Sequence, residues 1–207
     1  MSGSSAFLNP LKTGPIVVVA TVGEAEGSRG AAAALACAPA DVDFATLLVD
    51  VGGRAPRPAL LASAAAQKLE ERLLARLPEL RVAARGQVCH LAVPAVREGL
   101  VAAAAAGDVA RGAAMVLHVP PHLLEEAVSV GADLRPTGVL LRCDFPEDRP
   151  LLALAVRGLM LRGLTVGVLK QRLSWVAERR ALFGALPAGA PGGLSERLAA
   201  RLLGAPR

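Results

Sequence analysis

The fold is decided by residues 15–38, which read PIVVVATVGEAEGSRGAAAALACA. Five consecutive apolar residues, Ile16–Ala20, predict a buried strand, and the alanine-rich run Ala31–Ala38 predicts a helix. The turn between them contains three glycines, Gly23, Gly27 and Gly30. A strand, a glycine-rich turn and a helix form the layout of a phosphate-binding loop, in which the N–H groups of the helix face an anion. The turn is therefore the first candidate for a binding site.

The residues that give such a loop its chemistry are missing. A phosphate-binding loop has the pattern G-x-x-x-x-G-K-[ST], in which the lysine reaches the phosphates and the hydroxyl binds Mg²⁺. None of the three lysines of the chain follows a glycine. Glu24 and Glu26 lie in the turn instead and would repel a polyphosphate. The stretch therefore predicts the fold more firmly than it predicts an activity.

Composition indicates one domain with a core of small aliphatic side chains. The chain has 207 residues, of which 53% are hydrophobic and only 2% aromatic, so leucine, valine and alanine must fill the core. No apolar run approaches the roughly 20 residues that span a bilayer. The first residues lack the charged and apolar regions of a signal peptide, which favours a cytoplasmic location.

We expect three segments. Residues 1–14 form a flexible leader, residues 15–185 an α/β domain, and residues 186–207 a linker and a C-terminal amphipathic helix that docks on the domain. Leu194, Leu198 and Leu202 share one face of that helix. The helix is short and lacks aromatic residues, so any membrane contact would be at most peripheral.

Strands and helices alternate along the whole domain. Strands are predicted at 16–22, 45–51, 87–93, 113–119, 137–143 and 164–169, and residues 82–86 are ambiguous. Helices are predicted at 31–38, 59–77, 95–106, 122–130, 148–162, 173–183 and 194–203. The strands are continuous apolar runs, which is typical of a mostly parallel sheet covered on both faces. The prediction is a three-layer α/β/α sandwich in which Ile16–Val22 is an interior strand, flanked by Ala45–Val51 or Ala113–Val119.

Charge and cysteine content favour neither a metal site nor nucleic acid. The net charge is +5, but the arginines are scattered along predicted helices and the aromatic residues that stack on single strands are missing. The three cysteines lie far apart in apolar runs, without metal-ligand spacing; they are Cys37, Cys89 and Cys143. We expect buried, structural cysteines, no metal and no nucleic-acid partner.

Several stretches, in this order, resemble the MinD/ParA ATPases. VVVATVGEAEGSRGAAAALA resembles their deviant Walker A loop, which is close to KGGxGKTT and is followed by a helix with Leu-Ala. ATLLVDVGG resembles the second strand of the family, and AAMVLHVPPHLLEEAVSVGADLRPTGVLLRC resembles the stretch that contains D-x-P-P. RGLTVGVLKQR and FGALPAGAPGGLSERLAARLLG resemble the last strand and the closing helix. The nearest group by resemblance is the one that places Tad-type pili, TadZ/CpaE.

The resemblance implies a P-loop NTPase-like fold with a degenerate site. Aligning Leu35-Ala36 with the family's Leu-Ala puts Gly23 at the signature lysine, Ser28 at the phosphate lysine and Arg29 at the Mg²⁺-binding hydroxyl. In the same register, two further positions of the nucleotide site have changed, to His118 from the aspartate of D-x-P-P and to Lys170 from asparagine. The positions that keep the family's residue type are Gly27, Asp50, Pro120 and Pro121.

The function expected from this resemblance is that of a non-catalytic pseudo-ATPase, a scaffold or localisation factor in pilus assembly or in cell-pole or septum positioning. It would bind no cofactor. Its partners would be proteins: a second copy bound through the former nucleotide face, or a related ATPase or secretion component. One carboxylate about 4 Å from a phosphate charge costs roughly 4 kcal/mol at an effective dielectric of 20, and the turn carries two.

Other readings remain open. The chain could be a divergent nucleotide-binding ATPase that uses Arg29 in place of the lysine, or an unrelated α/β enzyme. For single residues the simpler expectations are an ion pair of Arg29 with Glu24 or Glu26, a turn capped by Asp50, and a hydrogen-bonded, half-buried His118. Spacing alone assembles no Ser/His/Asp or Cys/His set.

Overall fold

The computed structural model describes residues 14–23, 27–38, 45–53, 61–129, 134–169, 194 and 196–203. Several predictions fall on residues outside these ranges. They are the leader up to residue 13, the helix at 173–183, the linker at 186–193, and the side chains of Glu24, Glu26 and Lys170.

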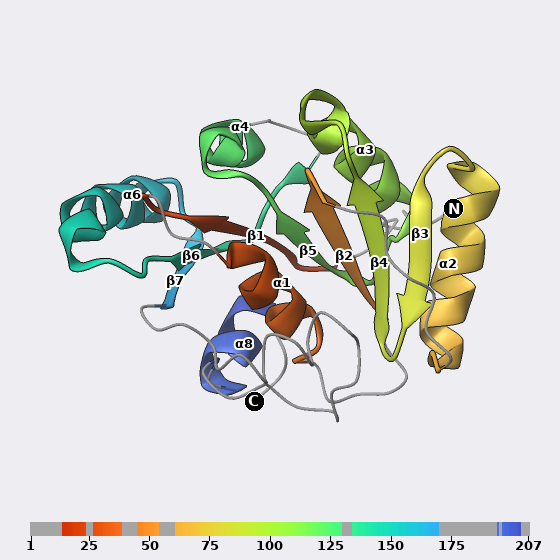
Figure 1. Ribbon diagram of the computed structural model, residues 1–207. Coiled ribbons are helices and arrows are strands. Elements are labelled where there is room, and N and C mark those ends of the chain that lie inside the picture. The colour runs from red at the N-terminus through yellow and green to blue at the C-terminus, as the bar shows by residue number, and fades with distance from the viewer. Residues whose placement is uncertain are drawn as a thin grey trace, which may run out of the picture.

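The centre of the molecule is a seven-stranded sheet with the order β3-β4-β2-β5-β1-β6-β7 (Figure 1). The strands are β1 (Ile16–Thr21), β2 (Thr46–Val51), β3 (Arg81–Arg85), β4 (Val88–Val93), β5 (Ala114–His118), β6 (Gly138–Arg142) and β7 (Thr165–Leu169). All neighbouring pairs are parallel except β3 and β4. The predicted α/β class and mostly parallel sheet are confirmed. So is the interior position of β1, which lies between β5 and β6.

The ambiguous residues 82–86 are resolved as the antiparallel edge strand β3. The chain turns back into β4 at Gly86, whose φ of +56° suits glycine. Arg81 and Arg85 lie at the two ends of this strand, and between them Ala83 and Ala84 are buried. The strand has only five residues and an arginine at each end, so its apolar pattern is weak in the sequence.

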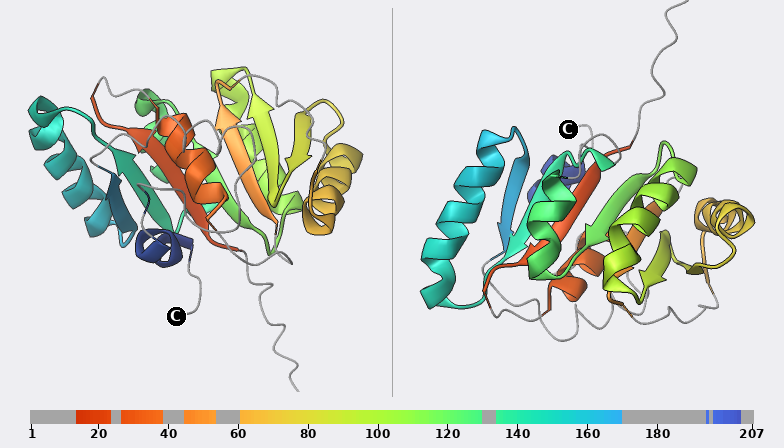
Figure 2. Two further views of the ribbon diagram at one scale, coloured as in Figure 1. Left: turned by 60° about the horizontal axis from the view of Figure 1, so that its bottom comes forward. Right: turned by 90° about the horizontal axis from the view of Figure 1, so that it is seen from above.

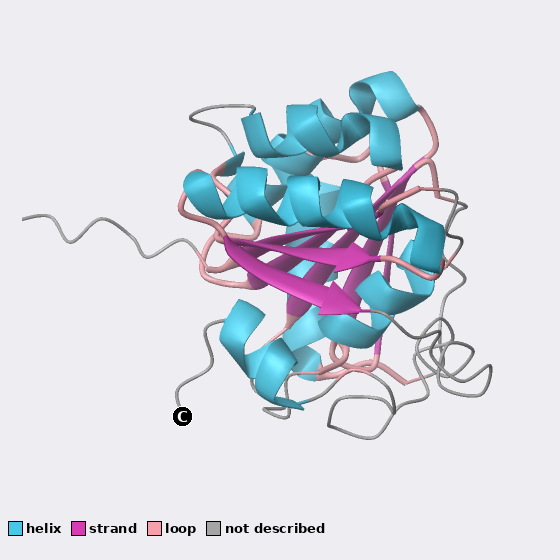
Figure 3. Cartoon of the chain, turned by 90° about the vertical axis from the view of Figure 1, so that its left-hand side faces the viewer, coloured by secondary structure: helices cyan, strands magenta, loops and turns pink. Residues whose placement is uncertain are grey.

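Helices cover both faces of the sheet. They are α1 (Ser28–Ala36), α2 (Ala64–Arg76), α3 (Val96–Val109), α4 (Leu124–Ser129), α6 (Arg149–Leu161) and α8 (Glu196–Leu203), with short 3-10 turns η1 (Pro121–Leu123) and η2 (Pro146–Asp148). Buried side chains of α1 and α8 share one apolar cluster, and those of α2, α3, α4 and α6 share the other. Figures 2 and 3 show the two sets on opposite sides of the sheet. Among the described residues, no helix is long and apolar enough to cross a membrane.

The second helix begins later than the sequence predicts. Ser63 is its N-cap and accepts a hydrogen bond from the backbone N–H of Ala66. Just before the cap, Ala62 forms an isolated parallel bridge with Gly86, and Leu61 is 83% exposed. Leu61 therefore lies outside the helix, although the sequence predicts a helix over 59–77.

The C-terminal helix α8 packs on β6 and β7 through its leucines. Glycines in these strands leave room for them: a Cβ built at Gly167 would lie 2.8 Å from Cδ1 of Leu198, and one at Gly138 would lie 3.1 Å from Cδ2 of Leu202. Leu202 is 2% exposed. The apolar face of this helix is thus turned toward the sheet, on the same side as α1.

Candidate functional site

The candidate site lies at the carboxyl edge of the sheet, where β1 leads into α1. Gly27 is the N-cap of α1 and has φ +93°, a left-handed conformation that costs glycine little. The helix begins at Ser28, three residues earlier than the alanine-rich run predicts. This geometry places Ser28 and Arg29 in the first turn of α1, above the ends of β2 and β5.

Three side chains at this edge, those of Ser28, His118 and Asp50, form one hydrogen-bonded chain. Ser28 Oγ lies 2.7 Å from His118 Nε2, and His118 Nδ1 lies 2.8 Å from Asp50 Oδ1. Asp50 and His118 are paired positions on the adjacent parallel strands β2 and β5, so their side chains leave the sheet on the same face. All three are at least nine-tenths buried, with 7%, 6% and 2% of Ser28, His118 and Asp50 exposed.

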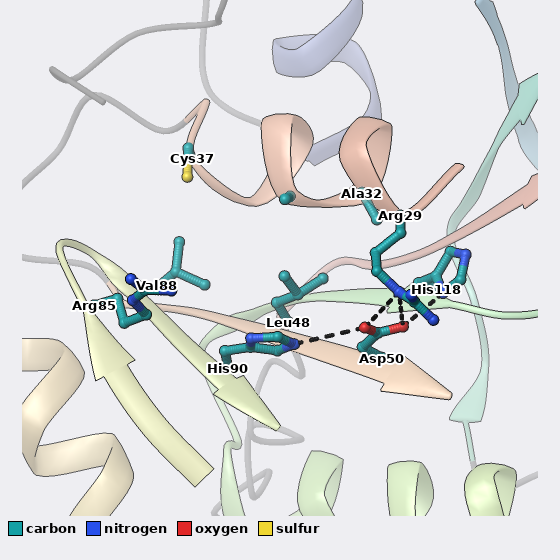
Figure 4. A pocket seen from close by; sticks show the side chains of 10 residues that line it. Arg29, Ala32, Cys37, Leu48, Asp50, Arg85, Val88, His90 and His118 are labelled. Atoms are coloured by element: carbon teal, nitrogen blue, oxygen red, sulfur yellow. Dashed lines mark hydrogen bonds and ion pairs between the residues drawn. The ribbon is translucent and has the colours of Figure 1, made fainter. Parts of the chain in front are cut away.

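Arg29 completes the cluster from the helix. Its Nε lies 2.8 Å from Asp50 Oδ2 (Figure 4), and its Nη2 donates to the backbone carbonyl of Gly52 at 3.2 Å. Burial by itself would raise the pKa of Asp50. The hydrogen bond from His118 and the positive charge of Arg29 outweigh burial and hold this pKa below its ordinary value. Asp50 is therefore a carboxylate.

The charge on Asp50 fixes the role of one nitrogen of His118. A carboxylate only accepts, so His118 carries its proton on Nδ1 and donates it to Asp50. In the neutral imidazole, Nε2 is then an acceptor, and the Ser28 hydroxyl donates to it. The order hydroxyl, imidazole, carboxylate is the one that activates serine nucleophiles.

A small cavity lies beside this cluster, between α1 and the strands β2 and β4. Its volume is about 30 Å³, room for one or two water molecules. His90 lines it, with Nε2 3.9 Å from Asp50 Oδ2. Within the described part of the chain this nitrogen has no hydrogen-bond partner. Burial is the main cause that lowers the pKa of His90, so its neutral form is favoured. Figure 4 shows Cys37 and Arg85 farther along the same cavity.

A second polar cluster, at the end of β6, bonds to the backbone of the turn before α1. Arg142, the last residue of β6, is 1% exposed. It donates from Nη1 to the carbonyl oxygen of Gly27 at 2.6 Å and from Nε to Asp144 at 2.9 Å. A Cβ at Gly27 would overlap this guanidinium, so glycine is required there for space as well as for φ. Sequence reasoning missed Arg142, although a single charged residue inside the apolar strand TGVLLRC was a usable signal.

Another carboxylate lies against the first glycine of the turn. Gly23 has φ +71°, and a Cβ built on it would overlap the carboxylate of Asp148. Asp148 ends η2 on the far side of the turn. Together with Asp50 and Asp144, this puts three described carboxylates at the edge where a phosphate-binding loop would need positive charge.

The structure brings together Ser28, Arg29, Asp50 and His118, four residues that the sequence had singled out. Two of the simpler expectations need correction. The side chain of Asp50 does not cap a turn, because it bonds His118 and Arg29, and the Gly53 N–H bonds the backbone oxygen of Asp50. His118 is buried rather than half-buried.

The remaining predicted residues of the site lie around this cluster. Gly30 lies in the first turn of α1, Pro120 follows β5, and Pro121 begins η1. Arg29 pairs with Asp50, whereas its expected partners Glu24 and Glu26 lie outside the described residues. A Ser/His/Asp set, which spacing could not assemble, is present.

The cysteines take no part in the cluster. All three are free thiols; Cys89 and Cys143 are buried, whereas Cys37 is only partly buried, contrary to expectation. Burial raises the pKa of Cys37 to about 11 and that of Cys89 to about 12. Both thiols are therefore protonated and unreactive at neutral pH. The described residues contain no group of three His, Cys, Asp or Glu that could hold a metal ion.

Comparisons with known proteins add no family. No family model matches the chain, and no curated protein matches it.

Proposed function

We propose that this chain is a non-catalytic, MinD/ParA-like pseudo-ATPase with a three-layer, P-loop NTPase-like fold, and that it acts as a protein-interaction or localisation scaffold. The observation that carries the proposal is the state of Asp50. In the register of the resemblance this is the acidic residue of the nucleotide site. Here it is 2% exposed and bonded by Arg29 and His118. It is already neutralised by protein groups.

Charge at the turn supports the same conclusion. Phosphoryl transfer depends on a lysine and Mg²⁺ to neutralise the phosphates. In this chain the hydroxyl of Ser28 is hydrogen-bonded to His118, the guanidinium of Arg29 pairs with Asp50, and Asp148 lies against Gly23. The cavity beside Asp50, about 30 Å³, is far below the roughly 300 Å³ at which ligand pockets begin.

The alternative, a nucleotide-binding ATPase that uses Arg29, is less well supported. Its guanidinium would have to release Asp50 and the Gly52 carbonyl before it could bind a phosphate. Release would leave the buried carboxylate of Asp50 without its ion pair to Arg29, which is costly. Arg29 therefore fits the role of a structural counter-ion better than that of a phosphate ligand.

Thermal unfolding with and without Mg-ATP tests the proposal. A nucleotide at about 100 times its dissociation constant would stabilise the folded chain by roughly 2.7 kcal/mol, which is several degrees of melting temperature. We expect no shift with millimolar Mg-ATP or Mg-ADP and no phosphate release. An ATP-dependent shift that disappears in Arg29→Ala and persists in Arg111→Ala, an exposed arginine elsewhere, would establish the alternative.

A second candidate function, that of an acyl hydrolase, is favoured by the Ser28–His118–Asp50 chain. In that reaction Ser28 Oγ would bond to the carbonyl carbon of an ester while its proton passes to His118 Nε2. The leaving alcohol would take this proton, and water would release the acid. The low exposure of Ser28, 7%, is the observation against it.

Covalent labelling separates this candidate from the scaffold. A fluorophosphonate probe reacts with an activated serine, and peptide mass spectrometry locates the label. On the scaffold proposal no peptide is labelled. A label on Ser28 that is lost in His118→Gln, and retained in Ser63→Ala, a serine that caps α2, would establish a hydrolase.

A further inference from the structure

A hollow of about 590 Å³ lies between the last two turns of α2 and the end of α3, apart from the polar cluster of Ser28, His118 and Asp50. Both helices pack on the same face of the sheet (Figure 1). We call this hollow the arginine groove, and its lining residues are Arg72, Ala75, Arg76, Asp108, Val109 and Arg111. Its volume is in the range of sites that hold ligands, and half of its lining residues are arginines.

The lining residues of the arginine groove leave an excess of positive charge. Three guanidinium groups and one carboxylate give a net charge of +2. Arg111 Nη2 lies 3.3 Å from Asp108 Oδ1, but these side chains are 56% and 74% exposed, and such an exposed pair contributes little. Arg76 has no hydrogen-bond or ion-pair partner within the described ranges. An anionic ligand would therefore displace little that is already bonded.

One arginine of the groove is held in place by the end of a helix. Arg72 donates from Nη2 to the backbone carbonyl of Val109, the last residue of α3. This carbonyl is one of those that a helix leaves without a donor of its own. A guanidinium has five N–H donors, so the other donors of Arg72 are left for a ligand. Because Arg72 is already oriented, a ligand that binds it loses less side-chain entropy.

The positive charge is confined to a short stretch of surface. Glu70 and Glu71 precede Arg72 along the chain, and Glu79 follows Arg76. Single-stranded nucleic acid binds along a longer basic track with aromatic side chains on which its bases stack. None of the described residues that line the groove is aromatic. A compact basic site of this kind fits a short acidic segment better than a long polyanion.

We propose that the arginine groove binds an acidic segment of a partner protein, whose carboxylates pair with Arg72, Arg76 and Arg111. This rests on the scaffold function proposed above and names the chemistry of its partner. The fork of a guanidinium matches a carboxylate through two parallel hydrogen bonds, which is why arginine suits this recognition. Two carboxylates of the partner would balance the net charge of the groove.

Fluorescence anisotropy of fluorescein-labelled hexaglutamate, titrated with the full chain at low ionic strength, measures this binding; labelled hexaglutamine is the uncharged probe. We expect saturable binding of hexaglutamate alone, which weakens as salt is added. Arg76→Gln should raise the dissociation constant about 10-fold, because it removes a charged hydrogen-bond donor. The matched control is Arg157→Gln on α6, an exposed arginine whose loss changes the net charge equally and should leave the constant unchanged. Circular dichroism melts establish that both variants are folded.

Asp108→Asn tests the sign of the effect within the groove. It removes the one carboxylate of the lining and should lower the dissociation constant about 2- to 5-fold, since Arg111 is then released for the ligand.

Four outcomes would each overturn the proposal: no saturable binding of hexaglutamate, equal weakening by Arg76→Gln and Arg157→Gln, weaker binding in Asp108→Asn, or tighter, Arg76-dependent binding of a single-stranded oligonucleotide. A thermal shift with Mg-ATP that disappears in Arg29→Ala would contradict only the pseudo-ATPase function.

Discussion

The carboxyl edge at α1 and the outer side of α6 are opposites. At the edge, polar side chains are buried, with 2% of Asp50 and 6% of His118 exposed; on α6, Leu161 is 81% exposed. Each region reverses the usual distribution of polar and apolar residues. The buried polar groups bond to one another, whereas no described residue covers the exposed leucines.

This difference separates a closed site from an open one. Hydrogen bonds within the Ser28–His118–Asp50 chain and the ion pair to Arg29 satisfy buried groups that would otherwise be expensive. A ligand there would have to replace contacts that already exist. A partner on α6 would only remove apolar surface from water, which is favourable. The carboxyl edge is therefore a closed polar cluster, whereas the outer side of α6 leaves apolar side chains exposed.

The largest effect is expected from removing the centre of the polar cluster. Asp50→Ala leaves His118 and Arg29 without their carboxylate, and breaking a buried pair costs about 3–5 kcal/mol. We expect the lower end, about 3 kcal/mol, because Arg29 is 44% exposed and can reach water. Urea unfolding measures it, with Asp108→Ala, an exposed pair member, as control. Equal losses in the two variants would show that the cluster contributes no stability.

A smaller loss is expected from Gly27→Ala. The alanine would have to adopt φ +93° and would displace the Arg142 guanidinium, so we expect a loss of about 2–3 kcal/mol. Gly112→Ala is the control for backbone strain alone, because Gly112 has φ +89° but a Cβ built on it would meet nothing within 4 Å. It should lose only about 1 kcal/mol. Identical melting temperatures for the two variants would mean that Arg142 moves away without cost.

The third prediction is a pH dependence that originates at His90. Burial lowers the pKa of this histidine in the folded chain, while the charges of Asp50 and Arg85 act in opposite directions on it. Protonation therefore favours the unfolded chain, in which the pKa is about 6.5. Stability is complete above that pH and is lost below it, by up to about 1.4 kcal/mol per pH unit.

Urea unfolding between pH 7.5 and 5 measures this slope, and His90→Leu should reduce it. Titration of carboxylates contributes little above about pH 5. A slope that is the same in His90→Leu would show that His90 is protonated as readily in the folded chain as in the unfolded one.

The smallest effect on stability is expected at the exposed leucines of α6. Leu161→Ala should change the free energy of unfolding by no more than about 0.5 kcal/mol, as for other surface positions. Val101→Ala, similarly exposed on α3, is the control. A loss well above that of Val101→Ala would mean that Leu161 is covered within the monomer, and the contrast with the carboxyl edge would disappear.

The sequence was sufficient for most of the architecture. Continuous apolar runs predicted the parallel strands, because a strand covered on both faces needs apolar side chains throughout. Glycine positions marked the turn before α1. Element ends were less predictable: the start of α2 depends on the Ser63 cap and on the bridge between Ala62 and Gly86, a contact that forms only when β3 folds back.

Tertiary structure alone decided the arrangement of the carboxyl edge and of the outer side of α6. Ser28 and His118 are 90 residues apart in the chain, and only the register of β2 with β5 and the start of α1 bring them within 2.7 Å. On α6 the sequence RPLLALAVRGLML is apolar on all sides, so its pattern cannot tell which leucines face the sheet. The sequence by itself determines which positions are apolar. Their burial or exposure depends on which surfaces neighbouring elements cover, and that is a property of the assembled fold.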